Sequence, residues 1–209
     1  MKLTVKPGRD NKVHIHIDGE YRLTVDGDYW FTSSWHSKKE IDGDELEELT
    51  DEIEKRRAFN SAASLALTRL HSRGELVTKL SRKFSRENAE YAAKKCEETG
   101  LVNDRDFAFL YADELANRKN MGLSRIKLEL KRKGISAELV EEALEEIEIC
   151  PEEKLKEIIE RKYLNYLSDE KGRRRTVNAL LRLGYGYSDI KRALENFETE
   201  LNEGDFFDE

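Results

Sequence analysis

Basic side chains recur at matching places in this 209-residue chain, and they are the groups best able to bind a charged partner. Lys131-Arg132-Lys133 has counterparts fifty residues earlier, in Arg82-Lys83, and fifty residues later, in Arg182. Two further clusters are Arg118-Lys119 and Arg173-Arg174-Arg175. Such groups arranged in a stripe can neutralise phosphates or an acidic protein surface. The candidate partner-binding residues are Arg82, Lys83, Arg118, Lys119, Lys131, Arg132, Lys133, Arg173, Arg174, Arg175 and Arg182.

The place of each cluster on its expected helix separates two explanations for the positive charge. Residues 131–133 are expected at the C-terminal end of a helix, where cations also stabilise the helix dipole. This cluster therefore either caps its helix or contacts a partner. Residues 173–175 are expected near the start of a helix over 173–183, where the dipole disfavours cations, so partner contact is favoured there.

Other residues whose side chains could act in catalysis or metal binding lack the partner residues that these functions need. His14 and His16 stand two apart on an expected strand, but no third ligand follows at a recognisable spacing. Cys96 and Cys150 have no CxxC spacing and are expected to be reduced thiols. The glycine-rich segment 184–187 follows a helix and lacks the lysine of a phosphate-binding loop. We therefore expect no enzyme activity, no metal and no cofactor.

The composition favours a helical protein with a large exposed surface. Charged residues make up 39% of the chain and apolar residues 38%, and the formal net charge is −7. Residues 40–54 hold nine acids, whereas residues 56–100 hold ten bases and five acids. This segregation points to a charged polymer or an oppositely charged protein as partner, although solvated helix faces also explain single clusters. No apolar run approaches the roughly 18 residues that cross a bilayer, so we expect a cytoplasmic protein without membrane contact.

One block of sequence occurs three times at a spacing of fifty residues. Leu130–Ile135 aligns with Leu180–Tyr185 without a gap, and Leu80–Lys83 occupies the same frame in the first copy. A fixed period of this length is typical of tandem helical modules that bury their apolar faces against one another. Gly134 and Gly184 are expected to reverse the chain in the left-handed conformation, and the first copy lacks this glycine.

These patterns predict a mostly α fold, with three tandem three-helix repeats in an elongated curved array and a small N-terminal antiparallel β element. Val13, Ile15 and Ile17 alternate with polar residues and predict a strand, and Asp18-Gly19 predicts the following turn. The expected segments are a β element over 1–39, an acidic linker helix over 40–55, repeats over 56–100, 101–150 and 151–199, and an acidic tail over 200–209.

The order and spacing of three segments resemble the RecX family of bacterial regulators of the RecA recombinase. The segments are Glu75–Leu80 in the first repeat, Asn103–Ala108 at the start of the second, and Ile126–Ile135 around its second helix. The resemblance covers roughly residues 56–199. The N-terminal strands around Asp18–Tyr21 resemble an extension found in some members.

The resemblance implies a regulator, usually an inhibitor, that lies in the groove of the RecA–DNA filament. Such a protein restrains ATP turnover and strand exchange, and so affects recombination, DNA repair and the SOS response. The implied partners are the RecA filament and single-stranded DNA within it, and we expect the chain to act as a monomer. The family is not enzymatic and uses no cofactor.

Two other functions remain open from the residues themselves. A direct nucleic-acid-binding module would use the basic stripe, including residues 131–133 and 173–175, without a recombinase. A general helical scaffold would use the same extended surface to hold a different protein partner.

Overall fold

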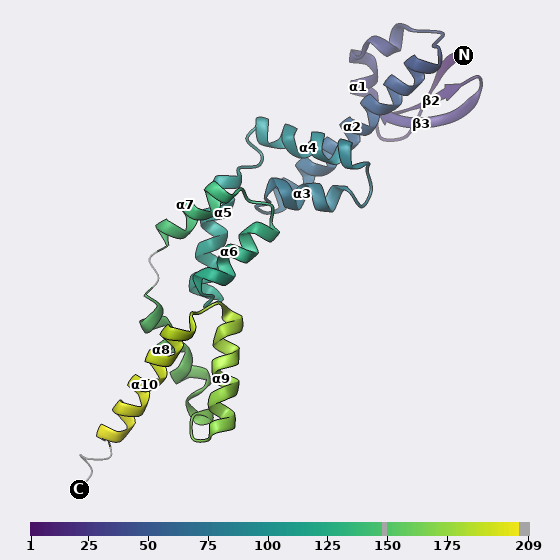
Figure 1. Cartoon of the computed structure of the whole chain (residues 1–209). Coiled ribbons are helices and arrows are strands. Elements are labelled where there is room, and N and C mark those ends of the chain that lie inside the picture. Colours follow the sequence, from purple (N-terminus) through teal and green to yellow (C-terminus); the bar gives the residue numbers. More distant parts are fainter. Residues whose placement is uncertain (148–149, 205–209) are drawn as a thin grey trace.

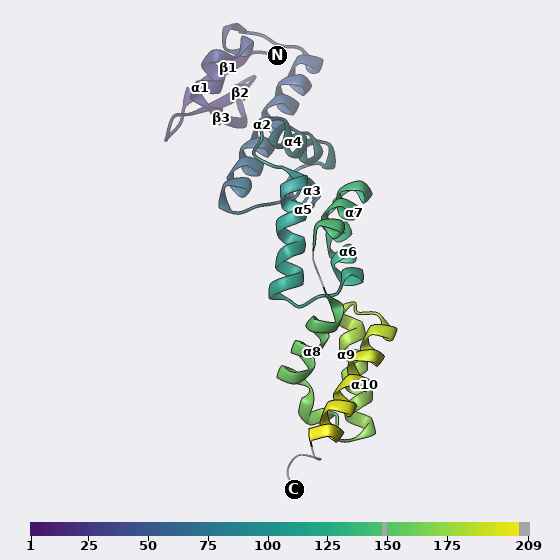
Figure 2. The same ribbon diagram turned by 90° about the vertical axis from the view of Figure 1, so that its left-hand side faces the viewer.

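The computed structural model describes residues 1–147 and 150–204, with side chains described as far as Phe197 in the last helix. The chain forms a long rod, with a small sheet at one end and the last helix at the other (Figures 1 and 2). The predicted class, a helical repeat array with an N-terminal β element, is confirmed. Four separate clusters of buried residues follow one another along the chain, so no single core spans the rod.

The N-terminal sheet has three antiparallel strands in the order β1 (Leu3–Pro7), β2 (Lys12–Ile17) and β3 (Glu20–Asp26). The predicted alternation on β2 is confirmed, because Val13, Ile15 and Ile17 are all buried. After β3 the chain forms a short helix, α1 (Gly27–Thr32), and a single 3-10 turn. Their tryptophans complete the small core, since Trp30 is 2% exposed and Trp35 is 4% exposed.

Helix α2 (Gly43–Thr68) connects the sheet to the repeats as one continuous element. Its N-terminus is closed by a capping box, in which Asp42 and Glu45 each accept the other's backbone N–H. Leu49 and Ile53 pack on the sheet, whereas Ala58 and Ala62 pack in the first repeat. The boundary expected between residues 55 and 56 therefore falls inside a single helix.

The first repeat consists of the second half of α2 with α3 (Arg73–Leu80) and α4 (Arg86–Glu98). Small side chains allow its helices to approach closely, since Ala89, Ala92 and Ala93 on α4 are fully buried. Ser85 caps α4 through its hydroxyl, as the sequence predicts.

The second repeat contains α5 (Asp104–Asp113), α6 (Leu123–Arg132) and α7 (Ala137–Glu146). Helix α5 runs on into a π-helical turn over Glu114–Arg118, which buries Leu115 and Ala116. Asn103 and Ser136 cap α5 and α7.

The third repeat contains α8 (Pro151–Lys162), α9 (Glu170–Leu183) and α10 (Tyr187–Gly204). Helix α9 begins three residues before the expected start at Arg173. Helix α10 continues through residues 200–204, which the sequence assigned to an acidic tail. The rest of that expected tail, residues 205–209, lies outside the described residues.

Candidate interaction surface

The candidate surface is positioned by two joints between successive repeats, and both joints use the same elements. In each, the N-terminus of a repeat's second helix meets the turn that follows the second helix of the next repeat. Gly74 meets Gly134 at the first joint, and Gly122 meets Gly184 at the second. The turn glycines Gly134 and Gly184 are fifty residues apart, as in the sequence repeat, and Gly74 and Gly122 are 48 residues apart.

The turn glycines are required for two reasons, and the sequence revealed one of them. Gly134 and Gly184 have φ values of +79° and +94°, as expected for left-handed turns. They also lie against backbone of the preceding repeat: a Cβ on Gly134 would stand 2.9 Å from Cα of Gly74, and one on Gly184 would stand 2.5 Å from N of Arg125. The first repeat has no preceding repeat to receive, which accounts for the missing glycine there.

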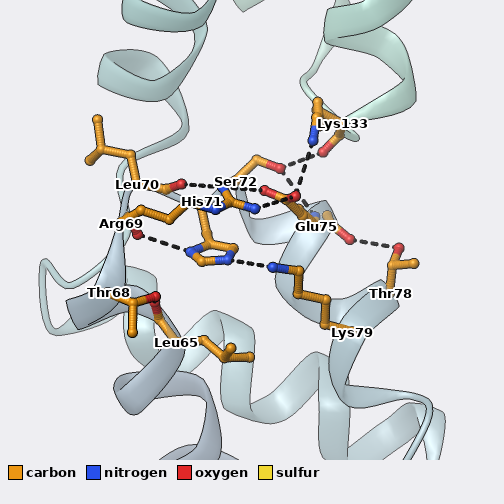
Figure 3. A network of polar contacts seen from close by, with 11 residues as sticks. Leu65, Thr68, Arg69, Leu70, His71, Ser72, Glu75, Thr78, Lys79 and Lys133 are labelled. Atoms are coloured by element: carbon orange, nitrogen blue, oxygen red, sulfur yellow. Dashed lines mark hydrogen bonds and ion pairs between the residues drawn. The ribbon is translucent and has the colours of Figure 1, made fainter.

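The first joint is closed by a polar network around Glu75 (Figure 3). Arg69 Nη2 lies 2.8 Å and Lys133 Nζ 3.0 Å from the same carboxylate oxygen of Glu75, and the Ser72 hydroxyl donates to the Lys133 carbonyl over 2.5 Å. Burial opposes the negative charge, but the hydrogen bonds from Arg69 and Lys133 outweigh it and lower the pKa of Glu75 to about 2. Glu75 is therefore ionised throughout the neutral range.

His71 borders this network as a neutral imidazole (Figure 3). It is 3% exposed, and burial lowers its pKa. Its Nδ1–H donates to the Arg69 carbonyl over 2.9 Å, and its Nε2 accepts from Lys79 Nζ over 2.8 Å. The imidazole thereby fixes the segment that carries Arg69.

The second joint uses backbone contacts and one phenol in place of an ion pair. The Gly122 N–H donates to the Leu183 carbonyl over 2.8 Å. The Tyr185 hydroxyl donates to the Asn120 carbonyl over 3.2 Å. Burial, with a smaller effect of Glu157, raises the pKa of Tyr185 to about 12, so its hydroxyl remains a donor at neutral pH.

The arginine triplet of the third repeat divides into residues with different surroundings. Because α9 begins at Glu170 with Asp169 as its N-cap, residues 173–175 lie beyond its first three positions, where the helix dipole acts less strongly on their charge. Arg173 Nε donates to the Leu167 carbonyl over 2.9 Å and so holds the loop before the helix. Arg174 and Arg175 are exposed.

Arg175 and Arg182 come together on the outer face of α9. They line one shallow depression with Asn178 and Leu181, residues that are one or two helical turns apart. Leu181 is 41% exposed and lines the same depression. This depression joins positive charge, an amide and an apolar surface in one place, as suits a partner carrying both charge and apolar groups.

The basic residues of the second helix in the other repeats are partly engaged within the chain. Arg132 Nη1 lies 3.0 Å from Glu129 Oε1, which also lies 2.7 Å from Arg125 Nη2. Lys133 belongs to the first joint and lies 5.4 Å from the Tyr111 ring centre. Lys131 is exposed beside them.

The remaining predicted residues lie on the surface at two helix ends. Arg82 and Lys83 are exposed in the turn after α3, and Arg118 and Lys119 are exposed at the end of the π-helical turn. The structure thus brings Arg175 and Arg182 into one depression and places the other clusters at separate positions along the rod.

Sequence reasoning missed three residues that define this surface. Arg125 stands fifty residues before Arg175 and could have been found from the repeat alignment. Glu75 gave no such signal, because its partner Lys133 is far away in sequence and belongs to another repeat. Arg69 pairs with Glu75 and joins the contact between the repeats through it.

Known proteins agree with this architecture. A family model described as RecX, second three-helix domain, matches residues 103–144. Regulatory protein RecX of Caldanaerobacter subterraneus subsp. tengcongensis is 30% identical over 205 residues, covering 95% of this chain and 96% of the relative. The chain belongs to the RecX family. Regulatory protein RecX of Clostridium acetobutylicum is 25% identical over 209 residues, covering 96% of this chain and 97% of the relative.

Two solved RecX structures share the fold. A crystal structure of regulatory protein RecX superposes with a TM-score of 0.66 at 20% identity, covering 91% of this chain and 98% of the other. RecX from Lactobacillus salivarius gives a TM-score of 0.57 at 24% identity, covering 70% of this chain and 97% of the other.

Two classes of site are not found in the described part of the chain. Within residues 1–147 and 150–204, no group of three or more His, Cys, Asp or Glu side chains could hold a metal ion. Over the same residues no helix has both the length and the apolar character to span a bilayer.

Proposed function

We propose that this RecX protein regulates a RecA recombinase by binding along the RecA–DNA filament and lowering its ATPase and strand-exchange activity. Membership of a family of regulatory proteins supports a regulatory role. The proposal assigns the chain no catalytic step and no cofactor. Through the recombinase, it would affect recombination, DNA repair and the SOS response inside the cell.

The elongated array is the observation that carries the proposal. Four small cores in a row expose a long surface. Along it three arginines recur at one spacing, at or just after the end of each repeat's second helix: Arg82, Arg132 and Arg182. A polymer offers repeated sites to such a surface, so several weak contacts add together by raising the effective concentration of the next. A filament of protein and DNA therefore suits this shape better than a small ligand does.

The depression on α9 is the part of the surface we assign to partner contact most directly. Arg175 and Arg182 have no ion pair within the described residues, whereas Arg125 and Arg132 share Glu129. Unpaired guanidinium groups keep their full charge for phosphates or carboxylates of a partner.

The test is the ATPase rate of RecA on single-stranded DNA with the chain titrated in. The chain should lower the rate, and Arg175→Glu with Arg182→Glu should raise the required concentration by about tenfold or more. Arg161→Glu with Lys162→Glu is the matched control, because it changes the same charge on α8 of the same repeat. An unchanged rate with the chain in several-fold excess over filament sites would reject the proposal.

Direct binding of nucleic acid is the second candidate, favoured by the grouping of two arginines and an asparagine on one helix face. It predicts that a fluorescent oligothymidylate binds the chain without recombinase and is released steeply as salt increases. The same double variant would then weaken binding to the oligonucleotide alone. Binding only in the presence of RecA would exclude this second candidate.

A further inference from the structure

The outer edge of strand β3 is left uncovered by the described chain. The opposite edge, on β1, is covered at its start: the Leu3 N–H donates to the Lys39 carbonyl over 2.8 Å, and the Ile41 N–H donates to the Met1 carbonyl over 2.9 Å. Residues 4–7 of β1 have no backbone hydrogen bond outside the sheet within the described chain. Within the described residues, no backbone group of residues 21–25 hydrogen-bonds outside the sheet. An open edge of this kind is a template for an added strand.

A cleft of about 420 Å³ runs along this edge. Residues 21–26 of β3 line one side of the cleft, and residues of α2, including Ile53 and Arg56, line the other. Leu23, Val25 and Ile53 give the cleft an apolar surface, and Ile53 is only 3% exposed. The cleft therefore offers both backbone hydrogen-bonding groups and a place for apolar side chains.

Positive charge dominates the cleft of this otherwise acidic protein. Its lining contains four bases and two acids: Lys12, Arg22, Arg56, Arg57, Asp26 and Glu54. Lys12 pairs with Asp26, and Arg57 lies 3.3 Å from Glu54. Arg22 Nη2 lies 3.8 Å from Glu20 Oε2, which is outside the cleft lining, and Arg56 has no ion pair within the described residues. This balance favours an acidic occupant.

The aromatic rings near the cleft are already engaged, which argues against nucleic acid as the occupant. The guanidinium of Arg56 lies 4.8 Å from the centre of the Tyr29 ring. The ring of Tyr21 makes edge contacts with His14 and His16, each at 6.0 Å between centroids. Single-stranded nucleic acid stacks successive bases on open aromatic faces. Tyr21 is 58% exposed, whereas Tyr29 lies under Arg56, so these two rings do not form a row of open faces.

We propose that the edge of β3 and the adjoining face of α2 bind an extended acidic segment of another protein by strand addition. A bulge between Ile15 and His16 interrupts the pairing with Tyr21–Leu23, so the added strand would run along the regular stretch Leu23–Asp26. Alternate side chains of the segment would then face Ile53 and solvent. This site lies on the N-terminal sheet and the part of α2 beside it, and it does not depend on the proposed function.

The experiment selects binders from a phage-displayed library of random twelve-residue peptides, using the full chain as bait. Selected peptides should be rich in Asp and Glu, alternate these with apolar residues, and lack central proline. A synthetic selected peptide should protect amides within residues 23–26 from hydrogen exchange. Arg22→Glu with Arg56→Glu should weaken its binding at least tenfold, whereas Arg161→Glu with Lys162→Glu should leave binding unchanged.

A second variant tests the same contact with a smaller change of charge. If the double variant shifts thermal unfolding, the single change Arg56→Gln is used and should still weaken binding severalfold. The proposal is overturned if no peptide is enriched, if the protected amides lie outside residues 23–26, or if folded variants bind as tightly as the parent. Protection of these amides by a twelve-nucleotide oligothymidylate, or by self-association at high concentration, would overturn it in favour of nucleic acid or a second copy.

Discussion

Glu75 in the first repeat and Lys133 in the second hold a carboxylate oxygen and the ammonium nitrogen 3.0 Å apart across the joint between the repeats. The two residues are 58 positions apart in sequence. Glu75 exposes only 12% of its side chain, and Lys133 exposes 27%. A base in the predicted partner-binding stripe therefore stabilises the rod, so changing it would affect folding as well as binding.

Replacing this carboxylate should destabilise the chain in a pH-dependent way. The pKa of Glu75 is about 2 in the folded chain, below its ordinary value of 4.5, so ionisation stabilises the fold above pH 4.5. That stability is lost as pH falls from 4.5 towards 2. Glu75→Gln should lower the free energy of unfolding by roughly 2 kcal/mol at pH 7, and by progressively less below pH 4.5. Urea unfolding followed by circular dichroism at several pH values measures the difference.

Glu90→Gln is the control for this series, because Glu90 forms an exposed pair with Arg86 at 2.8 Å. Exposed pairs of this kind contribute at most about 1 kcal/mol. A difference for Glu75→Gln that stayed constant from pH 7 to pH 2.5 would show that its ionisation does not stabilise the joint.

Adding a methyl group at Gly184 should open the joint between the second and third repeats. Alanine there must adopt φ of +94° and would place Cβ 2.5 Å from the backbone nitrogen of Arg125. Gly100→Ala is a matched control, because Gly100 has φ of +73° with nothing within 4 Å of its added Cβ. We expect a loss of about 1 kcal/mol for Gly100→Ala from conformation alone, and a clearly larger loss for Gly184→Ala.

Small-angle scattering, in addition to denaturation, should distinguish Gly184→Ala from Gly100→Ala. A displaced third repeat changes the maximum dimension of the rod, so Gly184→Ala should alter it and Gly100→Ala should not. Equal losses of stability with equal dimensions would mean that the close backbone approach is unimportant.

The repeat pattern predicted the architecture because each repeat encodes its own short helices. Ser85 and Ser136 mark helix starts by capping, and Gly134 and Gly184 mark helix ends by their positive φ. These signals act over a few residues and are legible in one sequence.

Contacts between repeats could not be predicted in the same way. Gly74 carries no local sign that its Cα lies against Gly134, and Glu75 carries none that it pairs with Lys133. The continuous α2 was also missed, because its acidic first half and its alanine-containing second half differ in composition while the backbone runs through both. Such contacts cannot be predicted because the two partners are far apart in the sequence.

The Tyr185 hydroxyl should contribute measurably to the second joint. Tyr185→Phe removes the hydrogen bond to the Asn120 carbonyl at 3.2 Å and keeps the buried ring, which is 6% exposed. We expect a loss of about 1 kcal/mol in the free energy of unfolding. Tyr187→Phe is the control, since Tyr187 is 63% exposed, and its unfolding should not change. Equal unfolding curves for both variants would show that the Tyr185 hydroxyl does not stabilise the joint.

Arg173 and Arg174 are adjacent in sequence, but substitution of Arg173 should change stability, whereas substitution of Arg174 should change the effect on RecA. Arg173→Ala removes the hydrogen bond from Nε to the Leu167 carbonyl, 2.9 Å long, and should lower the free energy of unfolding by about 1 kcal/mol. Arg174 is exposed, so Arg174→Ala should leave unfolding unchanged and weaken the effect on RecA ATPase activity. Thermal unfolding and ATPase titration on the same preparations compare the two. If Arg173→Ala left unfolding unchanged yet weakened the ATPase effect, the triplet would act as one partner-binding unit after all.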